Sequence, residues 1–93
     1  MNRYVIERDL PGAGKLTSEQ IRGAAMISNE ALSQIGPAIQ WVQSHVTDDR
    51  IYCVYLAESE SVIREHARIA GLPADRISKV GRVIDPLTGT ASN

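Results

Sequence analysis

Residues 39–57, which read IQWVQSHVTDDRIYCVYLA, decide the fold because they predict a β-hairpin. Two runs rich in β-branched and aromatic residues, Ile39–Val46 and Ile51–Ala57, flank the polar insert Thr47–Arg50. Such runs are typical of strands, and a short polar insert between them is typical of a hairpin turn. We therefore expect two adjacent antiparallel strands in the middle of the chain.

The register of this hairpin determines which side chains meet. Pairing the more uniformly apolar faces of the two strands favours a three-residue loop, Asp48-Asp49-Arg50. In that register His45 lies opposite Cys53 and Gln43 lies opposite Tyr55, with Cβ atoms about 4.5–5.5 Å apart. The one cysteine of the chain and one of its two histidines are then expected to be neighbours on a single face.

The segments on either side of the hairpin alternate between strand and helix patterns. The predicted elements are strands over 3–10 and 76–85 and helices over 17–35 and 59–70. Thr17 and Gln20 can form a capping box at the start of the first helix, and Gly71 ends the second. The order of the elements is therefore β-α-β-β-α-β.

This order predicts a ferredoxin-like α+β fold, a four-stranded antiparallel sheet with two helices on one face. We expect a single domain over residues 1–86, followed by a flexible tail over residues 87–93. The helices leave one face of the sheet open. The side chains expected there are Val5, Glu7, Trp41, His45, Cys53 and Tyr55. This mixture is too apolar to remain wetted, so we expect a homodimer that pairs two open faces into a dimeric α+β barrel.

Composition limits the function classes. The formal charge is −1, with 10 basic and 11 acidic residues, so the electrostatic driving force for nucleic-acid binding is absent. No apolar run approaches the length of a membrane helix, and we expect no membrane partner. A single cysteine excludes an internal disulfide, which favours a cytoplasmic location.

The expected His45 and Cys53 pair suits a borderline divalent ion such as Ni(II), Zn(II) or Cu(II). Two other interpretations remain open. The imidazole can lower the pKa of the thiol and make it a nucleophile. Alternatively, Cys53 is a small apolar core residue and His45 an ordinary strand residue.

Two further residues complete the candidate metal ligands, which are His45, Cys53, His66 and Glu7. Glu7 is expected on the open face, where it either joins the site or pairs with an arginine. His66 lies on the inward stripe of the second predicted helix. If that helix covers the opposite face of the sheet, His66 and His45 cannot share an ion within one subunit.

The segments YVIERDLPGAGKLT, IQWVQSHVTDDRIYCVYLA, IREHARIAGLPADRIS and VIDP carry a resemblance to a known family. They resemble small nickel-binding ferredoxin-like proteins long catalogued as a domain of unknown function. The likeness extends from Tyr4 to Pro86. It implies a dimeric ferredoxin-like fold and binding of Ni(II), in metal handling or response, and it implies no established catalytic activity.

We therefore expect a nickel-binding homodimer. The alternative is a dimeric α+β barrel enzyme, in which His45, His66 or Tyr55 moves a proton on a small organic substrate. A third possibility is a structural dimer without a ligand.

Overall fold

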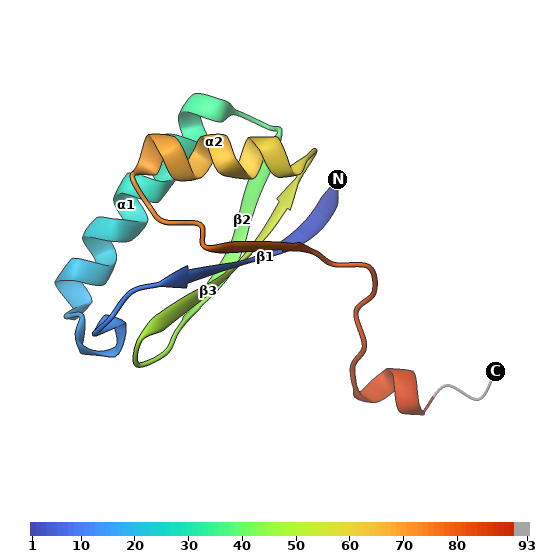
Figure 1. Ribbon diagram of the computed structural model, residues 1–93. Coiled ribbons are helices and arrows are strands. Elements are labelled where there is room, and N and C mark those ends of the chain that lie inside the picture. Colours follow the sequence, from blue (N-terminus) through green and yellow to red (C-terminus); the bar gives the residue numbers. More distant parts are fainter. Residues whose placement is uncertain (91–93) are drawn as a thin grey trace.

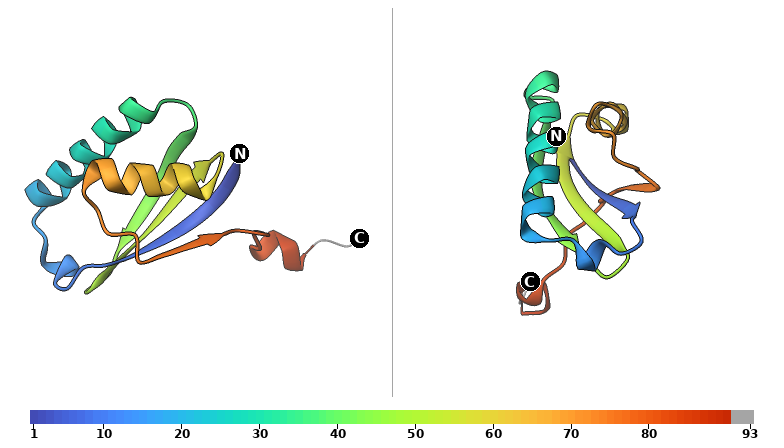
Figure 2. Two further views of the ribbon diagram at one scale, coloured as in Figure 1. Left: turned by 45° about the horizontal axis from the view of Figure 1, so that its top comes forward. Right: turned by 90° about the vertical axis from the view of Figure 1, so that its left-hand side faces the viewer.

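A four-stranded antiparallel sheet carries both helices on one of its faces (Figure 1). The computed structural model describes residues 1–90 of the chain. The main elements are β1 (Asn2–Asp9), α1 (Ser18–Ile35), β2 (Ile39–Val46), β3 (Arg50–Ala57), α2 (Glu60–Ala70) and β4 (Arg76–Lys79). The strand order is β2-β3-β1-β4, and Figure 2 shows the helices over the sheet from two further sides. The predicted ferredoxin-like α+β fold is confirmed.

Local sequence signals set the ends of both helices. The Thr17 hydroxyl accepts from the Gln20 amide, and the Gln20 side chain accepts from the Thr17 amide, which is the predicted capping box. Helix α2 ends at Gly71, whose φ of 69° lies in the left-handed region that glycine adopts without a steric penalty. Neither α1 nor α2 is long and apolar enough to cross a membrane.

The face of the sheet beneath the helices, here called the covered face, forms the core. Along β1 burial alternates, so that Tyr4, Ile6 and Arg8 are buried. The core cluster consists of Tyr4, Ile6, Ile39, Cys53, Tyr55, Ala57 and Ile63. Because Ile63 belongs to α2, the helix and the sheet share one apolar interior.

The hairpin register differs from the predicted one at the turn and again within β2. The Thr47 amide donates to the Arg50 carbonyl and Arg50 belongs to β3, so the turn is Asp48-Asp49 instead of the predicted three-residue loop Asp48-Asp49-Arg50. Strand β2 also contains a bulge. Trp41 pairs with Tyr55, whereas Gln43 pairs with Val54, so Val42 is an extra residue in the ladder. An extra residue reverses the faces of all side chains that follow it in the strand. The structure therefore places His45 opposite Tyr52, and the predicted pairing of His45 with Cys53 is wrong.

The predicted composition of the open face is also wrong for three residues, because the helices cover the face of the hairpin that carries Trp41, Cys53 and Tyr55. Trp41 lies on the covered face together with Ser44, and its indole Nε1 donates a hydrogen bond to Ser44 Oγ at 2.9 Å. Cys53 and Tyr55 are buried on the same covered face. Of the six residues predicted for the open face, Val5, Glu7 and His45 lie there.

The last strand is shorter than predicted, since β4 ends at Lys79 instead of Asp85. The chain leaves the sheet after Val80, whose amide donates to the carbonyl of Arg3. Residues 81–90 then extend away from the sheet and include a short 3-10 helix, Pro86–Gly89 (Figures 1 and 2). We call residues 81–90 the arm. The end of the predicted tail, residues 91–93, lies outside the described residues.

Candidate functional site

The four candidate ligands divide between the two faces of the sheet. Glu7 and His45 lie on the open face, and Cys53 and His66 lie beneath the helices. Among residues 1–90, no group of three or more His, Cys, Asp or Glu side chains is arranged to hold a metal ion. One subunit therefore does not bring the four ligands together.

On the open face, Glu7 and His45 belong to one row that crosses three strands. Glu7 pairs with Tyr52 across β1 and β3, and Tyr52 pairs with His45 across β3 and β2. Two strand spacings separate the backbones of Glu7 and His45, which is about 10 Å. Tyr52 thus stands between the carboxylate and the imidazole.

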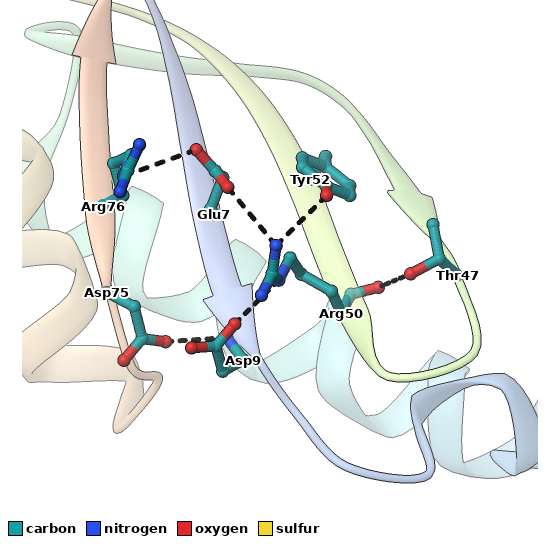
Figure 3. Close-up of polar contacts among 7 residues, drawn as sticks. All are labelled: Glu7, Asp9, Thr47, Arg50, Tyr52, Asp75 and Arg76. Carbon is teal, nitrogen blue, oxygen red and sulfur yellow. Dashed lines mark hydrogen bonds and ion pairs between the residues drawn. The ribbon is translucent and has the colours of Figure 1, made fainter.

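Glu7 lies between two guanidinium groups (Figure 3). Its carboxylate oxygens are 3.7 Å from Arg50 NH1 and 3.8 Å from Arg76 Nε. Arg50 also donates from Nε to Asp9 at 2.7 Å and from NH1 to the Tyr52 hydroxyl at 3.5 Å. These contacts are solvent-exposed, and exposed ion pairs of this kind are individually weak, so a cation can compete for the Glu7 carboxylate.

The imidazole of His45 is exposed to solvent. Its Nε2 lies 3.1 Å from the side-chain amide nitrogen of Gln43, the next residue along β2 on the same face. A surface imidazole whose contact is with a neighbouring side-chain amide remains available as a metal ligand.

Beneath the helices, five polar side chains form a buried polar cluster. Its members are Arg8, Ser28, Cys53, Tyr55 and His66. Arg8 Nε donates to the Cys53 sulfur at 3.5 Å, and Arg8 NH1 donates to the carbonyl of Pro73. His66 Nε2 lies 3.1 Å from the Ser28 hydroxyl, and the ring centres of His66 and Tyr55 are 5.3 Å apart.

Burial controls ionisation within this cluster. Desolvation lowers the pKa of His66, more than its hydrogen bond to the Ser28 carbonyl raises it, and the positive charge of Arg8 lowers it further. Desolvation also raises the pKa of the Tyr55 hydroxyl. Near pH 7 the imidazole and the phenol are therefore both neutral, next to the positively charged Arg8.

The buried polar cluster was not predicted as a unit, although two signals for it exist in the sequence. Arg8 shares the alternation of Tyr4 and Ile6 along β1, which assigns it to the covered face. Ser28 lies on the apolar stripe of α1, between Ala25 and Ala31. A charged or hydroxyl residue at an inward position indicates a buried polar contact.

Residues 4–80 match the sequence profile of the family described as "Nickel responsive protein SCO4226-like". The chain belongs to this family. It is also similar in structure to SCO4226 from Streptomyces coelicolor A3(2), with a TM-score of 0.71 and 23% sequence identity. That similarity covers 88% of this chain and 99% of the other, and it supports the fold. No curated protein matches the chain.

The match to the SCO4226-like family includes most of β1, from Tyr4 onward, and the whole of the other main elements. It ends at Val80, where the chain leaves the sheet. The arm therefore lies beyond the segment that matches the family profile.

Proposed function

We propose that this protein binds Ni(II) as a homodimer whose subunits meet through their open faces. Membership of the SCO4226-like family carries the proposal, because the family is described as nickel responsive and the match covers residues 4–80. The chemistry of the open face agrees with it, since imidazole nitrogen and carboxylate oxygen are suitable donors for Ni(II).

We assign the metal ligands to His45 and Glu7. Both side chains lie on the open face, and His45 is exposed. Cys53 and His66 lie on the opposite side of the sheet, where Arg8 and Ser28 hold them. They cannot reach the same ion without unfolding the core. Zn(II) and Cu(II) accept similar donors and are the expected competitors.

The homodimer accounts for the apolar part of the open face. A strip of partly exposed apolar side chains crosses its centre, formed by Val5, Tyr52, Val54 and Leu56. The arm exposes three more large apolar side chains, Val83, Ile84 and Leu87. A two-fold contact between open faces removes the strip from water and brings a second set of ligands to the interface.

Calorimetric titration of Ni(II) into protein made without an affinity tag tests the metal site. His45→Ala should weaken binding by about tenfold or more, because it removes a nitrogen donor. Gln40→Ala is the matched control on the same strand and should bind as the wild type does. Affinity should also fall in acidic solution, because protons compete with the metal ion for its protein ligands. Equal affinity and stoichiometry in His45→Ala would exclude His45.

Sedimentation of Val54→Glu tests the homodimer. The new carboxylate lies in the middle of the apolar strip, so the variant should have the mass of one chain at micromolar concentration, where the wild type has that of two. Asn29→Glu, which adds the same charge on the exposed side of α1, should remain a dimer. A wild-type mass of one chain would contradict the proposed dimer.

The enzyme hypothesis gains no support from the comparisons or from the site. Its candidate proton carrier His66 is 0% exposed and is held against Ser28, so a substrate cannot reach it without a rearrangement.

A further inference from the structure

A cavity lies between the first half of α1 and the covered face of the sheet. Its volume is about 110 Å³, and its walls are almost entirely apolar. It exists because α1 turns small side chains, Ala24 and Ala25, towards the sheet at this level, while the larger Met26 and Ile27 face solvent. Trp41 and Ile51 form the opposite wall.

The cavity opens to solvent along one side. Two of its lining residues, Ile21 of α1 and Val46 of β2, are 42% and 41% exposed. They mark an entrance between the helix and the end of this edge strand. A small molecule can therefore reach the cavity without separating α2 from the sheet.

Arg8 lines this cavity although it is only 2% exposed. Its Nε and NH1 atoms donate to Cys53 and to the Pro73 carbonyl, whereas its buried NH2 has no hydrogen-bond partner within residues 1–90. None of the carboxylates within residues 1–90 forms an ion pair with Arg8. A buried cation without a counter-charge is costly, so this position favours an anion.

The other polar groups at this position also favour an anion. Ser28 and Tyr55 line the cavity beside Arg8, and both carry hydroxyl groups that can donate. Burial raises the pKa of Tyr55 and lowers that of the adjacent His66, so both are neutral near pH 7 and neither supplies a counter-charge to Arg8. The guanidinium of Arg8 and these hydroxyl groups thus lie directly behind the cavity wall, whose exposed surface is almost entirely apolar.

We propose that this cavity binds a small organic monocarboxylate, with its carboxylate on Arg8 and its apolar body between α1 and Trp41. The single positive charge of Arg8 balances the single negative charge of a carboxylate. Inorganic phosphate has no apolar group that could pack against the apolar walls. An engineered apolar cavity of about 150 Å³ accepts benzene, so this smaller cavity accepts a body of about three to six carbon atoms, the largest of which extend into its open entrance. The site lies on the opposite side of the sheet from His45 and is independent of the proposed nickel site.

The fluorescence of Trp41 tests this proposal directly, because the chain contains one tryptophan and it lines the cavity. Benzoate and butyrate, titrated at pH 7, should each change the Trp41 emission, with dissociation constants on the order of 1 mM. The neutral isostere benzyl alcohol and inorganic phosphate should bind at least about tenfold more weakly, because each lacks one of the two required features. If neither carboxylate binds below tens of millimolar, or if benzyl alcohol binds as tightly as benzoate, the proposal is overturned.

Two variants locate the site. Arg8→Met replaces the guanidinium with a side chain of apolar character and should weaken benzoate binding by about tenfold or more while leaving benzyl alcohol unchanged. Ala25→Leu fills the cavity from α1 and should abolish binding of both carboxylates even if Arg8→Met does not fold. Met26→Leu on the exposed side of α1 and His45→Ala on the open face should both bind benzoate as the wild type does. Unchanged benzoate binding in Ala25→Leu would place the ligand elsewhere and refute the proposal.

Discussion

The two faces of the sheet carry the same three residue types, which are buried on one face and exposed or partly exposed on the other. An arginine, a histidine and a tyrosine lie beneath the helices as Arg8, His66 and Tyr55, and the same three types lie on the open face as Arg50, His45 and Tyr52. The first set is almost completely buried, and its imidazole and phenol are kept neutral. The second set is exposed or partly exposed and has weak, exchangeable partners.

This difference shows that residue type alone does not assign a chemical role in this chain. A histidine on the open face presents an exposed ring to a metal ion, whereas His66 is restrained by burial and by its contact with Ser28. The side of the sheet on which a residue lies therefore decides what it can bind. The following predictions test this contrast, beginning with the largest expected effect.

Truncation of neighbouring residues on β1 should give the largest difference. Ile6 is completely buried under the helices, and Ile6→Ala should lower the free energy of unfolding by about 2–5 kcal/mol, because it leaves a cavity in the core. Val5 is adjacent in sequence but lies partly exposed on the open face, so Val5→Ala should lower the free energy of unfolding by about 1 kcal/mol or less. Urea denaturation at low protein concentration measures both values, and equal losses would contradict the assignment of faces.

The two histidines should also differ in their effect on stability without metal. His66→Ala removes a fully buried ring that contacts Ser28 and Tyr55, and it should cost about 2 kcal/mol or more. His45→Ala removes an exposed ring and should change stability by about 0.5 kcal/mol or less. Chemical denaturation in the presence of a chelator measures both variants, and a larger loss in His45→Ala would reverse the comparison.

The pH dependence of stability should come from the covered side. Burial lowers the pKa of folded His66, so the unfolded chain takes up a proton first as the pH falls below about 6.5. Stability is then complete above that pH and falls as the pH approaches the folded pKa, by up to about 1.4 kcal/mol for each pH unit. His66→Gln should lose this component, and His45→Ala should retain it. A slope that persists in His66→Gln would assign the effect to another group.

The smallest effect should come from the ion pairs of the open face. Asp9→Asn weakens the contact of Asp9 with Arg50, which is 2.7 Å long and solvent-exposed, and it should cost about 1 kcal/mol or less. Added salt should reduce the difference between wild type and variant further. A loss of several kcal/mol that does not respond to salt would mean that this network is as important for the fold as the buried polar cluster.

The order of the elements and the fold were predictable because their signals are local. The Thr17 capping box, the helical stripe of α1 and the glycine at the end of α2 are each read within a few residues, and all are present in the structure. The strand pattern of the hairpin was equally local, and β2 and β3 begin within one residue of the predicted positions.

The candidate site was predicted less well because it depends on register and on distant contacts. Both alternations of β2 contain polar and apolar side chains, so the pattern does not reveal that Val42 is a bulge. The contact of Arg8 with Cys53 joins residues 45 positions apart, and no local pattern specifies it. Glu7 lies on the open face as predicted from the alternation of β1. His45 also lies there, but because two differences cancel: the face of β3 that carries Cys53 is the covered one, and His45 lies on the opposite face from Cys53.

The bulge at Val42 has a consequence for how copies of this protein can associate. Strand β2 is one lateral border of the sheet, and β4, which has four residues, is the other. A border strand that is interrupted by a bulge, or one that is very short, is a poor template for the addition of a foreign strand. The addition of a strand from a second molecule is therefore disfavoured at both borders, which protects the sheet against edge-to-edge aggregation.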